Sequence, residues 1–165
     1  MTPKLLYHEE KHIHYDGTNN PSYTRNISLN DDKWHHIALV RSGSILYLFI
    51  DGVIDNATNN TTNNSHLYIG QRGGGVNNFK GKIENVRLWE TVLSNDEIKN
   101  DMHAEIPNLA NLQATYNFNE SVPYGNNSAI TQVTDLNTSY HGTLHNFAKT
   151  GSSSNFTEGG YGVCK

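Results

Sequence analysis

The stretch from Lys33 to Asp55, "KWHHIALVRSGSILYLFIDGVID", constrains the fold more than any other part of this sequence. Nearly every residue from Ile37 to Ile50 is apolar or aromatic, except for the polar run "RSGS" in the middle. Two such runs joined by a polar turn are typical of a β-hairpin whose strands are buried in a sheet. The second run ends at Asp51-Gly52, a dipeptide that accepts the positive φ angles of a tight turn.

Both faces of the first strand carry apolar side chains. Successive residues of a strand point to opposite faces, so the sequence predicts which residues share a face. One face would hold Trp34, His36, Ala38 and Val40, and the other His35, Ile37 and Leu39. A strand that is apolar on both faces suits the interior of a two-layer sandwich, so we expect that arrangement.

Shorter segments predict further strands. The segments with alternating or apolar patterns between turn residues are "LLYHEEKHIHYDG", "SYTRNISL", "HLYIGQ", "FKGKIENVRLWE", "LQATYNFNE", "AITQVTD" and "YHGTLHNF". Strict alternation would put Ile83 and Val86 on opposite faces, so we expect a β-bulge near Glu84 and Asn85. The segment from Asp55 to Ser65 contains a single apolar residue, an alanine, and we expect a solvated connection there.

The sequence after "VRLWE" predicts one helix. Ser94 and Glu97 have the spacing of a capping box, and Leu93 and Ile98 stand where a hydrophobic staple forms. The residues expected to face the core are Ile98 and Met102, and Pro107 is expected to end the helix. About ten strands and one short helix predict an all-β fold, a two-sheet antiparallel β-sandwich of the jelly-roll kind.

Charge and composition argue against several classes of partner. The formal net charge of −4, with scattered Lys and Arg, provides no basic surface for nucleic acid. No apolar run approaches the ~20 residues of a membrane-spanning helix, so we expect no membrane insertion. The first ten residues, "MTPKLLYHEE", lack the layout of a signal peptide. The single cysteine, Cys164, excludes an intramolecular disulfide.

The motifs "WHHIALV", "LYLFIDG", "LYIGQ" and "FKGKIENVRLWETVLSNDEI" follow one another between Lys33 and Met102. Their order resembles the laminin-G-like and pentraxin group of the concanavalin A-like jelly rolls. That group has a W-H-H-I strand, a hairpin at D-G, an I-G strand, and a G-x-I-x-x-V-R-x-W strand leading into an L-S-x-x-E-I helix. The resemblance implies a jelly-roll module that is extracellular or at the cell surface.

Two departures from the group's pattern matter for the interpretation. Members usually have several more strands before W-H-H-I, so residues 1–165 form either a fragment or a permuted single domain in which strands of residues 109–148 complete the sandwich. Pentraxins carry acidic calcium ligands after the I-G-Q segment, so the resemblance implies Ca²⁺ as a candidate cofactor. Here the residues after Gln71 are Arg72 and three glycines, which supply no acidic ligand.

Catalysis is the first chemistry to consider, because jelly rolls of this class include glycoside hydrolases. These enzymes need two carboxylates about 5 to 9 Å apart on one face. The sequence has no E-x-D-x-E run, and the adjacent pairs Glu9-Glu10 and Asp31-Asp32 would point to opposite sides of a strand. Glu84 and Glu90 lie on a segment that resembles a structural strand of the family. We expect no enzyme, and a glycoside hydrolase stays a remote alternative.

Histidines near the N-terminus raise the hypothesis of a metal site. His12 and His14 are two residues apart, which places both rings on one side of a strand, and His8 and Glu10 are in phase with them. That set could hold Zn²⁺. Exposed polar residues on an edge strand explain the same pattern, because H-x-H is a common sequence.

Sugar recognition needs aromatic faces that stack on pyranose rings and polar groups that bind hydroxyls. Such residues gather in the N-terminal strands and in the glycine-rich segment "RGGGVNN". The candidate glycan-binding residues are Tyr7, His12, His14, Tyr23, Arg72, Asn77 and Asn78. Trp34 and Trp89 stand at positions that resemble core positions of the family.

We therefore expect a non-catalytic carbohydrate-binding or adhesion module of a larger extracellular protein. Its expected partner is a polysaccharide or other glycan, or an extracellular protein. A protein-interaction or spacer module without a small ligand is the alternative.

Overall fold

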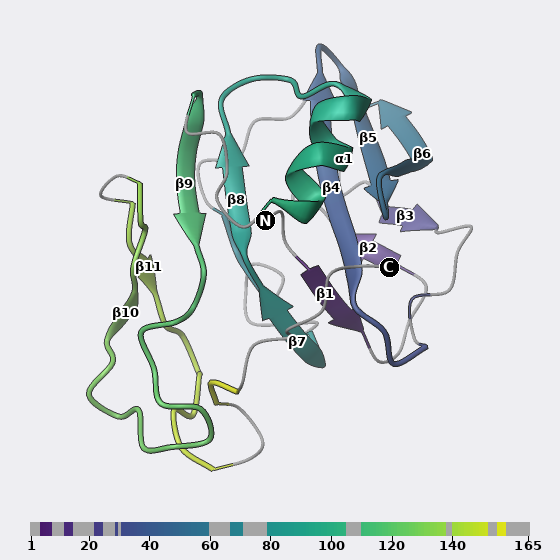
Figure 1. Ribbon diagram of the computed structural model, residues 1–165. Coiled ribbons are helices and arrows are strands. Elements are labelled where there is room, and N and C mark those ends of the chain that lie inside the picture. Colours follow the sequence, from purple (N-terminus) through teal and green to yellow (C-terminus); the bar gives the residue numbers. More distant parts are fainter. Residues whose placement is uncertain are drawn as a thin grey trace.

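The computed structural model describes residues 4–7, 12–14, 22–24, 29, 31–59, 67–70, 79–104, 110–137, 140–151 and 155–157. Within these residues the chain forms strands β1 to β11 and the helix α1, and every strand pairing is antiparallel (Figure 1). The expected fold class, antiparallel sheets with one short helix, is confirmed for this part of the chain.

A five-stranded sheet forms the centre of the described structure. In spatial order its strands are β6 (Val53–Asn59), β5 (Ile45–Ile50), β4 (His35–Ser42), β1 (Lys4–Tyr7) and β7 (Gly81–Glu84). β4 and β5 form the predicted hairpin, with Ile37 opposite Ile50. β1 pairs with β4 through Lys4 and Leu5, and with β7 along its whole length. β1 therefore joins the β4–β5–β6 sheet to β7.

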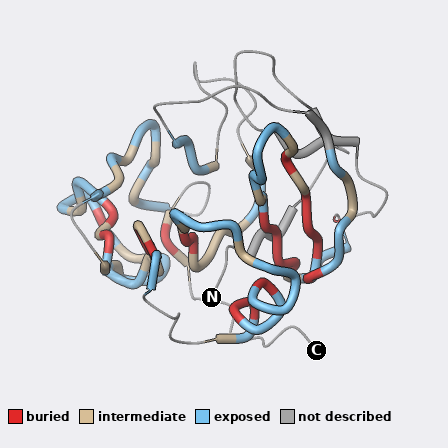
Figure 2. The backbone as a smooth tube through the Cα atoms, turned by 90° about the horizontal axis from the view of Figure 1, so that it is seen from above, coloured by how far each residue is buried: buried red, intermediate tan, exposed pale blue. Residues whose placement is uncertain are grey.

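The two faces of β4 are covered by different parts of the chain. One face is buried in a cluster of Leu29, Ile37, Leu46, Leu48 and Ile50. The other is buried in a cluster of Ala38, Phe49 and Ile98, flanked by half-buried Val40, Tyr47 and Leu93. Buried residues are consecutive from His35 to Ala38 and from Leu48 to Ile50, so both faces of these parts of β4 and β5 are covered; Figure 2 shows the buried stretches in red. The prediction of a strand packed on both faces is confirmed.

The helix α1 (Asn95–His103) begins at the predicted capping box. Ser94 Oγ accepts the backbone N–H of Glu97 at 3.3 Å, and the Glu97 carboxylate accepts the backbone N–H of Ser94 at 2.7 Å. Ile98 and Met102 are buried, and Leu93 packs in the same cluster as Ile98, as the staple predicts. The helix thereby covers one face of β4 and β5 (Figure 1).

The helix ends at His103, where the backbone of Ala104 becomes extended. Arg87, on strand β8 (Val86–Trp89), donates to the carbonyl oxygens of Asp101 and Ala104 at 3.2 and 3.1 Å. The last turn of a helix leaves carbonyl groups without partners inside the helix, and the guanidinium satisfies two of them. The expected terminator, Pro107, lies outside the described residues.

The expected bulge near Glu84 and Asn85 is instead a change of sheet. Asn85 has a φ of +54°, which few residues other than Gly, Asn and Asp tolerate, and it separates β7 from β8. β7 pairs with β1, whereas β8 pairs with β9 (Leu112–Tyr116). Ile83 and Val86 therefore lie in different sheets, which explains their irregular spacing. A register shift occurs further on, between Leu88 and Trp89.

Two further pairs complete the described strands. β2 (His12–His14) pairs with β3 (Ser22–Thr24), and β10 (Gln132–Val133) pairs with β11 (Gly142–Thr143). Val133 packs in a cluster with Val86, Ala114, Tyr116 and Phe156. This cluster joins the C-terminal strands to the β8–β9 pair.

Two segments differ from the expectation. Asp55 to Asn59, expected in a solvated connection, extends β6 along β5. An outer strand needs backbone hydrogen bonds but few apolar side chains, so Asn and Thr suffice there. Leu67 to Gly70, expected as a strand, form none, because Gly70 at a φ of +82° turns the chain out of an extended path.

Replacing Gly52 by valine should destabilise the fold. Asp51 and Gly52 have φ angles of +50° and +76°, which confirms the predicted two-residue turn of type I′. Valine resists this backbone conformation, and its Cβ would lie 2.8 Å from Cγ of Lys99 on α1. We expect the free energy of unfolding, measured by urea denaturation, to fall by about 1–3 kcal/mol.

Gly43→Val is the matched control for this substitution. Gly43 also has a positive φ, +60°, but an added Cβ there would meet no atom within 4 Å. The control should show the backbone cost alone and lose less stability. An unchanged free energy of unfolding in Gly52→Val would contradict the turn.

Ser94→Ala should reduce the free energy of unfolding by about 1 kcal/mol, because it removes the helix cap. Ser94→Asp retains an acceptor for the backbone N–H of Glu97 and should stay close to the parent. Urea denaturation of both variants checks the cap. Equal stability of the alanine and aspartate variants would mean that this hydrogen bond contributes nothing measurable.

Candidate functional site

The glycine-rich segment is described only at its two flanks. The candidates within it, which lie outside the described residues, are Arg72, Asn77 and Asn78. The backbone N–H of Phe79 donates to the carbonyl oxygen of Gly70 at 2.7 Å, so the two flanks lie side by side. Phe79 stands two residues before Gly81, the residue of β7 opposite Tyr7 of β1. The described flanks of the segment therefore lie close to the end of β1 that carries Tyr7.

The remaining candidates lie elsewhere. His12, His14 and Tyr23 are on the β2–β3 pair, where Ile13 is opposite Tyr23. β3 lies beside β6, whereas β7 is at the other edge of the five-stranded sheet (Figure 1). For these three residues and Tyr7 the structure describes the strand backbone but not the side chain. Of the candidates whose backbone is described, Tyr7 thus lies beside β7, whereas His12, His14 and Tyr23 belong to the pair beside β6.

The metal hypotheses fall largely on residues that are not described. His8, Glu10 and the residues after Gln71 lie outside the described ranges. Among the described residues, no group of three His, Cys, Asp or Glu side chains could hold a metal ion. Neither the zinc set nor the calcium position is therefore tested by the structure.

Three exposed tyrosines were not among the candidates. Tyr68, Tyr124 and Tyr140 are 45%, 57% and 59% exposed. Tyr68 and Tyr140 stand in the segments "HLYIGQ" and "YHGTLHNF", whose aromatic residues were interpreted as strand formers rather than as surface groups. A half-exposed ring offers a flat face on which a sugar can stack. Tyr68 is two residues before Gly70, at the flank of the glycine-rich segment.

Several carboxylates accept hydrogen bonds that hold the fold together. Asp135 is 3% exposed, and its two oxygens accept the backbone N–H groups of Thr115, Asn137 and Tyr140 at 2.9, 3.0 and 3.3 Å. Glu97 caps α1, as described above, and Glu120 accepts the backbone N–H of Thr134. These side chains stabilise loops and a helix end.

A buried ion pair fixes α1 to β8. Arg87 Nη1 donates to Oδ1 of Asp101 at 2.7 Å, and the two residues are 7% and 9% exposed. Burial lowers the pKa of the Arg87 guanidinium, while the charge of Asp101 and its hydrogen bond oppose that change. Because Arg87 also bonds the end of the helix, all of these contacts serve the fold rather than a ligand.

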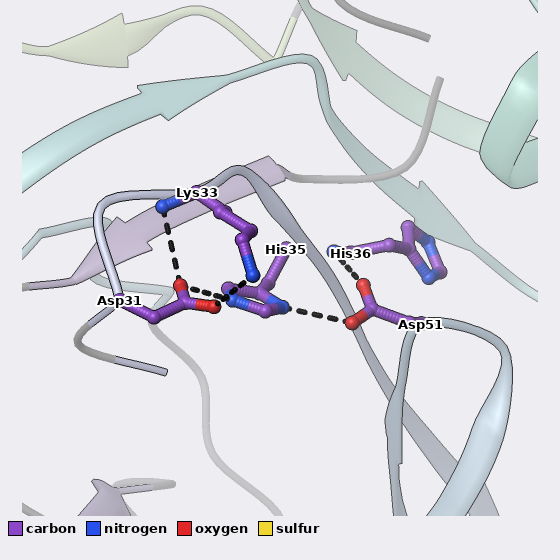
Figure 3. A network of polar contacts seen from close by, with 5 residues as sticks. All are labelled: Asp31, Lys33, His35, His36 and Asp51. Atoms are coloured by element: carbon purple, nitrogen blue, oxygen red, sulfur yellow. Dashed lines mark hydrogen bonds and ion pairs between the residues drawn. The ribbon is translucent and has the colours of Figure 1, made fainter. Parts of the chain in front are cut away.

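A cluster of charged side chains lies where the chain enters β4 (Figure 3). His35 is 8% exposed, with Nδ1 2.8 Å from Oδ2 of Asp51 and Nε2 2.9 Å from Oδ1 of Asp31. The other oxygen of Asp51 accepts the backbone N–H of His36 at 2.8 Å. The Lys33 ammonium lies 3.1 Å from Oδ2 of Asp31. The cluster ties the residues before β4 to the turn between β5 and β6.

The charges in this cluster shift two pKa values. The hydrogen bond with His35, followed by that with Lys33, holds the pKa of Asp31 well below its usual range. Burial of the His35 ring opposes its protonation, but the hydrogen bonds with Asp51 and Asp31 outweigh burial and raise its pKa. Both shifts favour the charged forms of Asp31 and His35.

Comparison with known proteins assigns the sequence to a family. Residues 9–99, more than half of the chain, match the profile of a laminin-G family described as the concanavalin A-like lectin/glucanases superfamily. No curated protein matches the chain. The match confirms the resemblance that the order of the motifs indicated.

Two solved structures are similar to the chain. A "putative carbohydrate binding protein" from Bacteroides ovatus has a TM-score of 0.60 and 20% identity, over 81% of this chain and 40% of that chain. An S-layer domain-containing protein from Clostridium thermocellum has a TM-score of 0.39 and 27% identity, over 49% of this chain and 44% of that chain. At 20% identity the first similarity shows the fold alone, and at a TM-score of 0.39 the second carries no argument. In the described part of the chain, no helix is long and apolar enough to cross a membrane.

Asp101→Ala should cost about 3–5 kcal/mol of unfolding free energy, because it leaves the buried Arg87 charge without its partner. Asn100→Ala is the matched control, since Asn100 is the exposed neighbour on the same helix. It should change stability by less than about 0.5 kcal/mol. Thermal and urea unfolding measure both variants, and a similar small loss in both would show that the ion pair does not secure the helix.

Proposed function

The chain belongs to the laminin-G family of the concanavalin A-like lectin/glucanases superfamily, and from this membership we propose that it is a non-catalytic carbohydrate-binding module. The observation that carries the proposal is the match over residues 9–99, which covers the β4–β5 hairpin, the β7–β8 segment and the start of the helix. The solved structure from Bacteroides ovatus, described as a "putative carbohydrate binding protein", has the same fold and supports this choice. We further propose that the module is part of an extracellular or cell-surface protein.

The use of the carboxylates favours binding over hydrolysis. A glycoside hydrolase needs two carboxyl groups free to act on a sugar, about 5 to 9.5 Å apart. Among the described residues, the carboxylates of Asp31, Asp51, Asp101 and Asp135 contact backbone N–H groups, His35, Lys33 or Arg87. A carboxylate held by such contacts is not free to act on a sugar. We therefore propose that the protein binds a sugar, as lectins do, rather than hydrolysing it, as glucanases do.

We propose the edge beside β7 as the glycan site. The flanks of the glycine-rich segment meet there, and the register puts Tyr7 opposite Gly81. Glycines allow the backbone to approach a ligand closely, and Arg72, Asn77 and Asn78 supply donors and acceptors for hydroxyl groups. The exposed ring of Tyr68 lies at the same flank. Aromatic faces and polar groups on one edge are what a pyranose requires.

A glycan array, followed by thermal unfolding with each hit, tests the proposal. A sugar that binds only the folded state raises the melting temperature by mass action. The array should be run with Ca²⁺ and with a chelator, because calcium stays a candidate cofactor. Release of reducing ends, measured on the same glycans, should be absent. No hit under either condition would favour the protein-interaction or spacer alternative.

The double variant Arg72→Ala/Asn78→Ala should reduce the affinity for the best glycan about tenfold or more, since each lost hydrogen bond costs about 0.5–1.5 kcal/mol. Isothermal titration calorimetry measures the affinity. Tyr23→Ala is the matched control from the other group of candidates, beside β6. A folded double variant with unchanged affinity, together with weakened binding by Tyr23→Ala, would move the site to the β2–β3 pair.

A further inference from the structure

We propose that the Asp31–His35–Asp51 cluster is a pH-dependent clasp, in which a doubly protonated His35 bridges two carboxylates and its deprotonation loosens the entry to β4. The geometry carries this inference. Each ring nitrogen of His35 lies within hydrogen-bond distance of a different carboxylate, 2.8 Å from Asp51 and 2.9 Å from Asp31. No other arrangement in the described residues places one titratable ring between two acidic partners.

An ionised carboxylate only accepts hydrogen bonds, so each of these two contacts needs an N–H on the histidine. The imidazolium has an N–H at both Nδ1 and Nε2. The neutral ring has one, and its other nitrogen would turn a lone pair towards a carboxylate oxygen at under 3 Å. Loss of the proton therefore replaces one hydrogen bond with a repulsive contact, and one of the two aspartates must move away.

The clasp matters because of what its members join. Asp51 begins the β5–β6 turn, accepts the backbone N–H of His36 and donates its own N–H to the carbonyl of His36 at 2.9 Å. His35 is also opposite Leu5 in the short pairing of β4 with β1. That pairing involves two residues of each strand and links the β4–β5–β6 sheet to β1 and β7. Loss of the contacts made by His35 therefore loosens the pairing of β1 with β4, which is the shortest pairing in the five-stranded sheet.

Three other charged residues, Lys33, Asp32 and Lys99, lie next to members of the cluster in the chain or in space. Lys33, before β4, pairs with Asp31, and Asp32 is its exposed neighbour in the chain. From the helix, the Lys99 side chain reaches Gly52, directly after Asp51. The two lysines weaken the negative field of the aspartates, and Asp32 reinforces it. The direct hydrogen bonds to His35 are shorter-range and stronger than these contributions.

The direction of the pH dependence follows from the folded and unfolded pKa values. The pKa of His35 is raised above its ordinary 6.5, so its stabilising contribution is complete below about pH 6.5 and is lost as the pH rises through the folded value. The pKa of Asp31 is lowered from its ordinary 3.8, so its contribution is complete above that value and is lost at more acidic pH. The clasp is therefore closed in mildly acidic solution and opens as the pH rises above 6.5 through the raised pKa of His35.

An NMR titration of the unmodified protein without any glycan tests the clasp. Two-bond ¹⁵N–¹H spectra distinguish a doubly protonated imidazole from each neutral tautomer, and the spectrum of His35→Gln assigns the signal. We expect His35 to be doubly protonated at pH 6.5 and to titrate above that value. In Asp31→Asn, which lacks one of the charged acceptors, the titration should move back towards 6.5. Titration of His35 at or below 6.5 in the unmodified protein would overturn the proposal.

Stability measurements give a second test that does not depend on sugar binding. Between pH 6 and pH 8.5 the melting temperature of the parent should fall by about 2–4 °C or more, and that of His35→Gln should not show this fall. His145→Gln removes an exposed histidine and should behave as the parent. Faster amide hydrogen exchange in β1 and at the start of β4 should accompany the fall. A parent and a His35→Gln variant with parallel pH curves would contradict the clasp.

Discussion

The β4–β5 hairpin is the constraint on which the rest of the structure depends, because both of its faces are apolar and must be covered. One face is buried with Leu29 from the chain before β4, and the other is covered by Ile98 of the helix. A fully buried Leu or Ile contributes about 1.5–3 kcal/mol relative to an exposed one, so leaving either face open would cost several such contributions. The helix and the N-terminal segment are therefore required by the hairpin, and their positions follow from it.

The ends of the covering elements are held by polar groups rather than by more apolar burial. The helix is fixed at one end by its capping box and at the other by Arg87, and the β5–β6 turn is fixed by the contacts of Asp51. Each of these groups supplies a partner for backbone N–H or C=O groups that the helix or the strands would otherwise leave unpaired.

The features that could be predicted from sequence are those set by local patterns. The β4–β5 hairpin, the Asp51-Gly52 turn and the capping box each depend on a few neighbouring residues, and all three are confirmed. The failures involve non-local pairing: residues 55–59 become a strand because β5 offers backbone partners, and Asn85 divides two strands that join different sheets. The seven candidate site residues stay predictions, since their side chains are not described. Strand register separates Tyr7 from His12, His14 and Tyr23, and no local pattern could have shown that.

The contacts of the carboxylates and the exposure of the aromatic side chains bear on whether the protein is a lectin or a hydrolase. A hydrolase keeps carboxylates out of structural hydrogen bonds so that one can be protonated and the other can attack or activate water. In this chain the carboxylates of Asp31, Asp51, Asp101 and Asp135 are engaged in structural contacts with other groups of the fold. Among the described residues, Tyr68, Tyr124 and Tyr140 are left exposed at the surface. Such a surface can stack on and hydrogen-bond a sugar without changing it, and this division of roles is the physical basis for proposing binding rather than catalysis.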